Sequence, residues 1–226
     1  MRRLIRSLMK SIIAAVILIS PSSAFAQVVS VNVFQPVSGG AQLTAEYFQE
    51  AKAIMQAAGA QVTTSSDLKG AFRFATIFDN WEAYGRVVQS LPTNESWGAF
   101  QNKIAGTRAA NQTDNLLLNQ RAAATNPVTG PGTVTQITVW EPTTGTMAEL
   151  VEGAMGAKPI HERAGASVSV YTGGGRMYYL MSFENFEAWG RNRDTPNPEF
   201  QAYMQSLGIP GSFGAIVVDQ ITATAF

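Results

Sequence analysis

The chain has 226 residues, 46% hydrophobic and 14% charged, with no cysteine, a single histidine and a formal net charge of zero. Without cysteine there are no disulfides and no thiolate chemistry, and without a cluster of Lys and Arg to neutralise phosphates nucleic acid is not expected as a partner. A single histidine also speaks against catalytic triads and against metal sites built from several histidines.

Residues 1–26 have the pattern of a secretory signal peptide. Four basic residues and no acid precede an apolar run over 11–20, and Ala24-Phe25-Ala26 is typical of a cleavage site. About ten apolar residues are too few for a membrane-spanning helix. We therefore predict cleavage between Ala26 and Gln27 and a periplasmic or secreted product without a membrane span. Its net charge would be 12 − 16 = −4, since the removed segment holds four of the 16 basic residues and none of the 16 acidic ones.

The remaining chain contains an internal repeat. The octet DNWEAYGR at Asp79–Arg86 returns as ENFEAWGR at Glu184–Arg191, with five of eight positions identical at an offset of 105. Upstream of it, VFQP at 33–36 matches VWEP at 139–142, and Ala-Gly-Ala at 58–60 matches 164–166, both at an offset of 106. Collinear matches of this kind indicate a duplication. We predict one repeat over 28–121, a linker over 122–132 and a second repeat over 133–226.

Each repeat is expected to begin with a strand and a helix. Val29, Val31 and Val33 alternate with polar residues, as Ile137 and Val139 do in the second repeat, which is the period of a half-buried strand. Apolar residues at helical spacing follow, over 43–58 and again from 147. The two helices are expected to end at Gly59 and Gly165, where a C-terminal cap favours glycine. Pro159 is expected to break or kink the second of them.

Two short strands joined by a hairpin come next in each repeat. They are predicted over 61–64 and 72–78, and over 167–171 and 177–183, with turns over 65–70 and 172–176. The glycine triplet 173–175 joins strand to strand, whereas a phosphate-binding loop joins strand to helix, so we interpret it as a turn.

The octet opens a second helix. Asp79 is the expected N-cap, with Glu82 completing a capping box, and Asn185 is expected to take this role in the second repeat. Gly85 and Gly190 lie inside these helices, where each costs about 1 kcal/mol relative to alanine. We therefore predict a close approach of this helix to the sheet or to a ligand.

A further helical stretch and a fourth strand should complete each repeat. The helical stretches are predicted over 97–104 and 199–207, and the strands over 115–120 and 215–222. The resulting order is β-α-β-β-α-β twice, which is an α+β, ferredoxin-like arrangement. Each four-stranded sheet would have helices on one face only, and the two sheets can cover each other.

The order of strand, helix, Ala-Gly-Ala, hairpin and the Phe-(Asp/Glu)-Asn-aromatic-Glu-Ala-aromatic motif resembles the dimeric α+β barrel superfamily. This superfamily includes antibiotic-biosynthesis monooxygenase-like and NIPSNAP-like domains. The resemblance implies that two ferredoxin-like halves of one chain form the barrel that most relatives build from two subunits, a monomeric pseudo-dimer for which further oligomerisation stays open. Members include cofactor-independent monooxygenases of aromatic substrates, haem-degrading enzymes, isomerases and lyases, so the fold does not choose the reaction.

The candidate site residues are aromatic and basic. They are predicted to bind a ligand and are Trp81, Tyr84, Arg86, Tyr179, Phe186, Trp189 and Arg191. Their rings, with Tyr171, Tyr178 and Phe183, fit either core packing or a flat apolar pocket. Arg86 and Arg191 could hold an anionic ligand or form surface ion pairs. His161 fits a solvated or capping helix residue, and alternatively a general base or an axial haem ligand.

No cofactor or metal is predicted. Haem is not supported by motif, because His161 lies in the first helix of its repeat and Trp81 opens a helix instead of lying on a strand. Three functions stay open for an exported protein. The first is binding of a small apolar or aromatic ligand, the second is a cofactor-independent monooxygenase or related enzyme, and the third is a scaffold for a protein partner.

Overall fold

The computed structural model describes residues 27–207 and 214–226, so the predicted signal peptide lies outside the described residues. Within the described ranges, no helix is both long and apolar enough to cross a membrane.

The two halves of the chain have the same order of elements. The first half contains β1 (Val28–Pro36), α1 (Ala41–Ala57), β2 (Gln61–Asp67), β3 (Phe72–Phe78), α2 (Trp81–Ser90), a 3₁₀ turn (Leu91–Thr93), α3 (Glu95–Ala105) and β4 (Ala110–Ala122). The second half contains β5 (Val134–Pro142), α4 (Met147–Arg163), β6 (Ser167–Gly173), β7 (Arg176–Phe183), α5 (Phe186–Asp194), α6 (Pro198–Ser206) and β8 (Ala215–Ala225). Strands β4 and β8 are longer than predicted.

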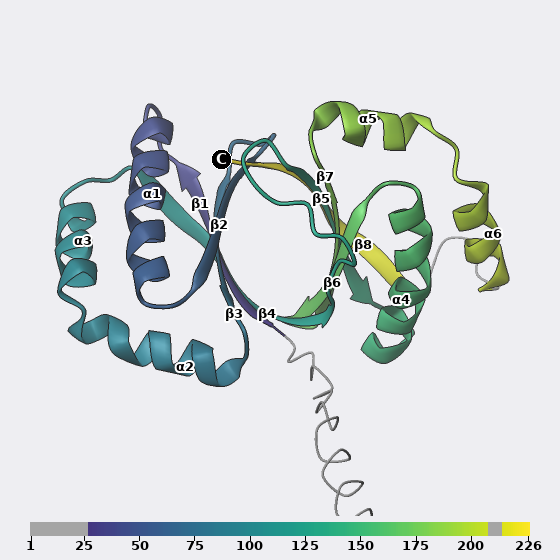
Figure 1. The fold of residues 1–226 in the computed structure, drawn as a ribbon, viewed down its shortest axis with the longest axis horizontal. Helices are drawn as coiled ribbons and strands as arrows, with labels where there is room; N and C mark the ends of the chain where they lie inside the picture. The colour runs from purple at the N-terminus through teal and green to yellow at the C-terminus, as the bar shows by residue number, and fades with distance from the viewer. Residues whose placement is uncertain (1–26, 208–213) are drawn as a thin grey trace, which may run out of the picture.

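The strands form one closed barrel in the order β1-β3-β2-β8-β5-β7-β6-β4. All neighbours are antiparallel, and the halves are joined where β2 pairs with β8 and β4 with β6. Helices α1 to α3 lie outside the barrel on one side and α4 to α6 on the opposite side (Figure 1). The predicted fold class, two ferredoxin-like units forming one α+β barrel, is confirmed.

The strand register places the two halves in correspondence residue by residue. Val28 pairs with Phe78 in the first half, and Val134 with Phe183 in the second, which gives offsets of 134 − 28 = 106 and 183 − 78 = 105. The pairing of β1 with β4 shifts register after Val33, and the pairing of β5 with β8 shifts after Val139. These two positions are also 106 residues apart. These are the offsets of the sequence repeat, so equivalent positions can be compared directly.

Alternation along the strands separates two kinds of core. Val29, Leu118, Val139 and Tyr178 form a buried cluster with other strand residues and no helix residue, so they fill the barrel interior. The opposite strand faces pack under the helices, around Phe48 in the first half and around Leu150 in the second. The predicted period of two in the first strands is confirmed, since odd-numbered valines of β1 face inward.

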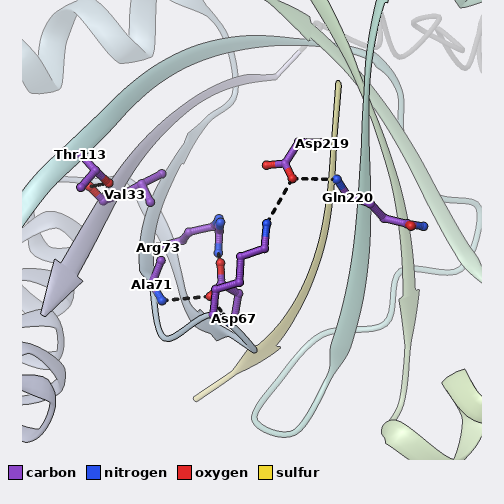
Figure 2. A network of polar contacts seen from close by, with 8 residues as sticks. Val33, Asp67, Ala71, Arg73, Thr113, Asp219 and Gln220 are labelled. Atoms are coloured by element: carbon purple, nitrogen blue, oxygen red, sulfur yellow. Dashed lines mark hydrogen bonds and ion pairs between the residues drawn. The ribbon is translucent and has the colours of Figure 1, made fainter. Parts of the chain in front are cut away.

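The β2–β3 hairpin is held by a buried carboxylate. Asp67 accepts hydrogen bonds from the backbone amides of Lys69 and Ala71, both 2.9 Å, and pairs with Arg73 at 2.8 Å. Lys69 then reaches across to Asp219 of β8 at 3.4 Å, an exposed ion pair between the two halves (Figure 2). In the equivalent hairpin, Gly174 and Gly175 have positive φ of 57° and 77°, which confirms a tight turn at the glycine triplet.

The N-cap prediction for the octet helix is wrong in the first half and confirmed in the second. Asn80 caps α2 by accepting a hydrogen bond from the Ala83 amide at 2.8 Å, and Asn185 does the same for α5 at 2.9 Å. With Asn80 as the cap, the third helical residue is Ala83, so Glu82 is one position too early for a capping box.

Of the break or kink predicted at Pro159, the break is wrong and the kink stays a prediction. Helix α4 is continuous over 17 residues, the same length as α1. Proline removes one backbone hydrogen bond, but Ala157 and Ile160 on either side of it are buried. Lys158 and Glu162 also form an ion pair of 2.9 Å across it, with little exposure of either side chain. Packing therefore holds both sides of the proline in one helix.

The close approach to the sheet predicted at the octet glycines is absent, and an approach to a ligand stays a prediction. A Cβ atom built on Gly85 or Gly190 would meet nothing within 4 Å. The close approaches lie elsewhere, at Gly40, whose Cβ would be 2.1 Å from the Ala109 carbonyl oxygen, and at Gly156, whose Cβ would be 2.2 Å from the Tyr203 hydroxyl. The predicted caps at Gly59 and Gly165 are confirmed by positive φ of 94° and 89°.

Because Gly85 is helical and unobstructed, Gly85→Ala should raise the free energy of unfolding by about 0.5–1 kcal/mol, the difference in helix propensity. Gly40→Ala should lower it, since the new methyl group would overlap a backbone carbonyl. Urea unfolding of both variants measures this. A destabilised Gly85→Ala protein would contradict the open environment of this helix.

Candidate functional site

A cavity of about 590 Å³ lies in the first half, between the outer face of the barrel and helices α1, α2 and α3. Its wall is dominated by aromatic rings, which are Phe34, Tyr47, Phe48, Phe74, Phe78, Tyr84, Trp97 and Phe100. Cavities of this size and composition are typical of small-molecule binding sites.

The periodicity of each element places these rings. Phe34 on β1 and Phe74 and Phe78 on β3 occupy the strand positions that point away from the barrel interior. Phe48 lies on the buried face of α1, Tyr47 packs edge-on against Phe100 of α3, and the other rings come from α2 and α3. Eight different elements or segments therefore meet around one space, counting β4 and the turn and loop that flank α3.

The rings support one another by edge contacts. Phe48 lies edge-on to Phe34 and Phe74, with centroids 5.4 and 5.3 Å apart, and Phe78 lies edge-on to Tyr84 at 5.2 Å. Edge-to-face pairs of this kind add about 0.5–1.5 kcal/mol each beyond the burial of area. The rings of the wall thus form contacting groups and are not independent side chains.

The polar side chains of this wall are uncharged, since none of the described residues lining the cavity is an Asp, Glu, Lys, Arg or His. Asn32, in β1 as expected, accepts hydrogen bonds on its Oδ1 atom from Asn115 at 2.6 Å and from Gln112 at 3.1 Å. Its side-chain carbonyl is therefore engaged, and its amide group is the part that a ligand could use. Ser30 and Thr76 add hydroxyl groups to the same wall.

Of the three ligand-binding residues predicted in the first half, Tyr84 lines the cavity, whereas Trp81 and Arg86 do not. Trp81 is half exposed and donates its indole hydrogen to Asn119 at 3.1 Å. Arg86 forms an exposed ion pair of 2.5 Å with Glu82, one helical turn away, and is not among the lining residues.

The second half has a polar centre at the equivalent place. By the strand and helix offsets, His161 occupies the position of Met55, and Tyr179 that of Phe74. The Nδ1 atom of His161 lies 2.8 Å from the Tyr179 hydroxyl, and its ring packs on Phe200 with centroids 4.4 Å apart. Nε2 is therefore the one ring nitrogen that could act as a ligand or a base.

Burial sets the protonation of this pair. It lowers the pKa of His161, because the charged imidazolium loses hydration, and it raises the pKa of Tyr179 far above its usual value, with the charge of Glu162 adding to the effect. At neutral pH both groups are therefore uncharged.

The other predicted residues of the second half lie on α5. Trp189, at the position of Tyr84, donates to Gln136 at 3.2 Å, and Arg193 lies over its ring at 5.3 Å. Phe186 is 44% exposed, and Arg191 pairs with Glu187. Among the rings that fitted either core packing or a pocket, Tyr171 and Tyr178 belong to the barrel interior and Phe183 to the core beneath the helices.

A second cavity of about 550 Å³ lies beside His161, between the end of α4, helix α5 and the start of α6. Besides His161 it is lined by Arg163, Arg191, Asn192 and Glu199. The structure therefore brings two of the predicted residues, His161 and Arg191, to one cavity, with Tyr179 behind the histidine.

The space corresponding to the first cavity is filled differently in the second half. Where α1 carries Tyr47 and Phe48, α4 carries Gly153 and Ala154 at an offset of 106. Tyr203 of α6 takes the vacated room, donating its hydroxyl to the Gly153 carbonyl at 2.8 Å. Small residues on α4 thus admit the Tyr203 ring of α6, which packs directly against this helix.

Most of the residues lining the aromatic cavity, including Trp97 and Phe100, were not predicted as site residues. Their spacing of three was visible in the sequence, but it does not distinguish a cavity wall from a filled core. In residues 27–207 and 214–226 no group of three or more His, Cys, Asp or Glu could hold a metal ion. That no cofactor is bound stays a prediction.

No protein-family model matches the sequence, and no curated protein matches it. Solved structures do resemble it. A putative monooxygenase from Lactobacillus acidophilus NCFM superimposes with a TM-score of 0.61 at 14% identity, over 88% of this chain and 94% of that one. An anthrone oxidase-like protein gives a TM-score of 0.54 at 13% identity, over 88% and 91%. A putative chlorite dismutase gives 0.51 at 9% identity, over 89% and 95%. These likenesses show that the chain shares the α+β barrel fold of these proteins.

The histidine environment leads to a pH prediction. A neutral imidazole in the folded protein binds its proton less readily than in the unfolded chain, so protonation favours unfolding. The free energy of unfolding should therefore fall as the pH drops below the ordinary histidine pKa of 6.5 toward the lower pKa of folded His161.

His161→Met, which introduces the residue of the first half, should reduce this loss. Urea unfolding of both proteins at about pH 7.5 and about pH 5 measures it, since other titrating groups cancel in the comparison. An equal loss in the two proteins would show that His161 is not held neutral by burial.

Proposed function

We propose that this protein binds a small, flat, apolar molecule, with an aromatic ring system, in the cavity between α1, α2, α3 and the barrel. The observation that carries this proposal is the ring-lined space of about 590 Å³ without an ionisable acid or base other than two tyrosines on its described wall. The signal-peptide pattern of residues 1–26 further leads us to propose that binding takes place in the periplasm or outside the cell.

The chemistry of the wall supports this ligand class. Burial of apolar ligand surface contributes about 25 cal/mol per Å², and aromatic ligands can also make edge contacts with the surrounding rings. A charged ligand would lose its hydration without gaining an ion pair. Asn32, Ser30 and Thr76 lie on one strand-built side, so they could orient a single carbonyl or hydroxyl group of the ligand.

Anthrone, a flat tricyclic ketone, is a suitable probe. It should quench the fluorescence of Trp97 saturably, and Trp97→Phe should remove that part of the signal. Val88 lines the cavity and is 44% exposed, so it lies at the cavity's edge. Val88→Arg should weaken binding by about tenfold or more, because a charge must then be desolvated beside the ligand.

Gln89→Arg is the matched control, since it adds the same charge at the next position, which is exposed and outside the cavity wall. Its affinity should equal that of the unmodified protein. Absence of saturable quenching, or equal affinities for Val88→Arg and Gln89→Arg, would contradict binding in this cavity.

A second candidate function is a cofactor-independent oxygenase acting in the same cavity. The specific observation in its favour is the fold likeness to proteins named as a putative monooxygenase and as anthrone oxidase-like. For anthrone the reaction would be balanced by oxygen alone: one oxygen atom replaces the two hydrogens of the methylene carbon to give anthraquinone, and the other leaves as water.

Oxygen uptake with anthrone, measured with an oxygen electrode against the buffer rate, separates the two candidates. An oxygenase should consume one O₂ per anthrone, lose this activity in Val88→Arg and keep it in Gln89→Arg. Saturable binding of anthrone without oxygen uptake above the buffer rate would support the binding function and contradict the oxygenase.

A further inference from the structure

The two cavities of this molecule differ in the chemistry of their walls, although the helices and strands of the two halves correspond. The described wall of the first contains no charged side chain, whereas the second is lined by Arg163, Arg191 and Glu199 together with His161 and Asn192. At equivalent positions, Val87 of the first half is buried in the core and Asn192 of the second faces the cavity. A second ligand would therefore have to be polar.

The His161–Tyr179 pair supplies one fixed polar group to this cavity. The buried phenol is uncharged and its oxygen lies 2.8 Å from Nδ1, so it holds the imidazole by that nitrogen. If the phenol donates, the neutral ring carries its hydrogen on Nε2, which has no hydrogen bond to any described residue. The ring is further fixed by its contact with Phe200.

Two guanidinium groups supply positive charge from different helices. Arg163 ends α4 and pairs with Glu199 of α6, and Arg191 of α5 pairs with Glu187. All four side chains are more than half exposed, so each ion pair is of the kind that contributes only about 0–1 kcal/mol. A carboxylate from a ligand could therefore replace either glutamate at little cost to the fold.

We propose that this second cavity is a separate binding site for a small organic carboxylate, with the carboxylate on Arg191 or Arg163 and the rest of the molecule beside His161 and Asn192. A carboxylate is favoured over other anions because both guanidinium groups already bind planar carboxylates in this arrangement, and the fork of arginine matches that geometry. The site is distinct from the apolar cavity and does not depend on its ligand.

The single histidine provides a direct readout. His161 is the only histidine in the chain, so the untagged protein has one imidazole Cε1–H signal in its NMR spectrum. Titration with benzoate should shift this signal saturably. Benzyl alcohol, of similar size but uncharged, should shift it at least about tenfold more weakly at equal concentration, because it cannot make charge-assisted hydrogen bonds.

The repeat offers a matched pair of variants. Arg86 and Arg191 are equivalent, each pairs with a glutamate four residues earlier, and their side chains are 65% and 63% exposed. Arg191 lines the second cavity, whereas Arg86 lines neither cavity. Arg191→Gln should weaken benzoate binding by about tenfold, and Arg86→Gln should leave it unchanged although it removes the same kind of surface ion pair.

Arg163→Gln tests the other guanidinium, and far-UV circular dichroism checks that each variant is folded. A loss of affinity in Arg191→Gln or Arg163→Gln, but not in Arg86→Gln, supports the site. The proposal is overturned if benzoate gives no saturable shift of the His161 signal. It is equally overturned if benzyl alcohol binds as well as benzoate, or if all three variants bind alike.

Discussion

Closure of the barrel is the constraint on which the rest of the structure depends. A four-stranded antiparallel sheet has two open edges and one face that needs cover, and the two halves resolve both needs at once by pairing β2 with β8 and β4 with β6. Val29, Leu118, Val139 and Tyr178 then fill the interior. The two cavities described above lie outside this interior, beside the helices.

The same framework allows the two halves to differ in what they enclose. Corresponding backbone positions carry Met55 and Phe74 in one half and His161 and Tyr179 in the other. Small residues on α4 let the Tyr203 ring of α6 pack directly against this helix. Exchange of a few side chains on a common backbone therefore moves the cavity and changes it from apolar to polar without altering the strand register.

Features that rest on a pattern repeated along the chain could be predicted from the sequence. Features that depend on a single contact could not. The offsets of 106 and 105, the alternation in β1 and the caps at Gly59 and Gly165 followed from pattern alone. The N-cap predicted at Asp79 was wrong, because the helix begins one residue later and Asn80 caps it. The break predicted at Pro159 was wrong, because buried residues on both sides of the proline hold α4 together. The aromatic cavity could be predicted only as a group of rings, since spacing does not tell a filled core from a hollow one.

The polar pair of the second half is difficult to explain by packing. Burial of an imidazole and a phenol removes their hydration, and their one mutual hydrogen bond restores only part of it. Met55 and Phe74 fill the equivalent volume in the first half without that penalty. His161 is also only partly buried and borders a cavity that contains two arginines. The pair is thus better understood as the wall of a site than as a component of the core, which is why we assign the second cavity a ligand of its own.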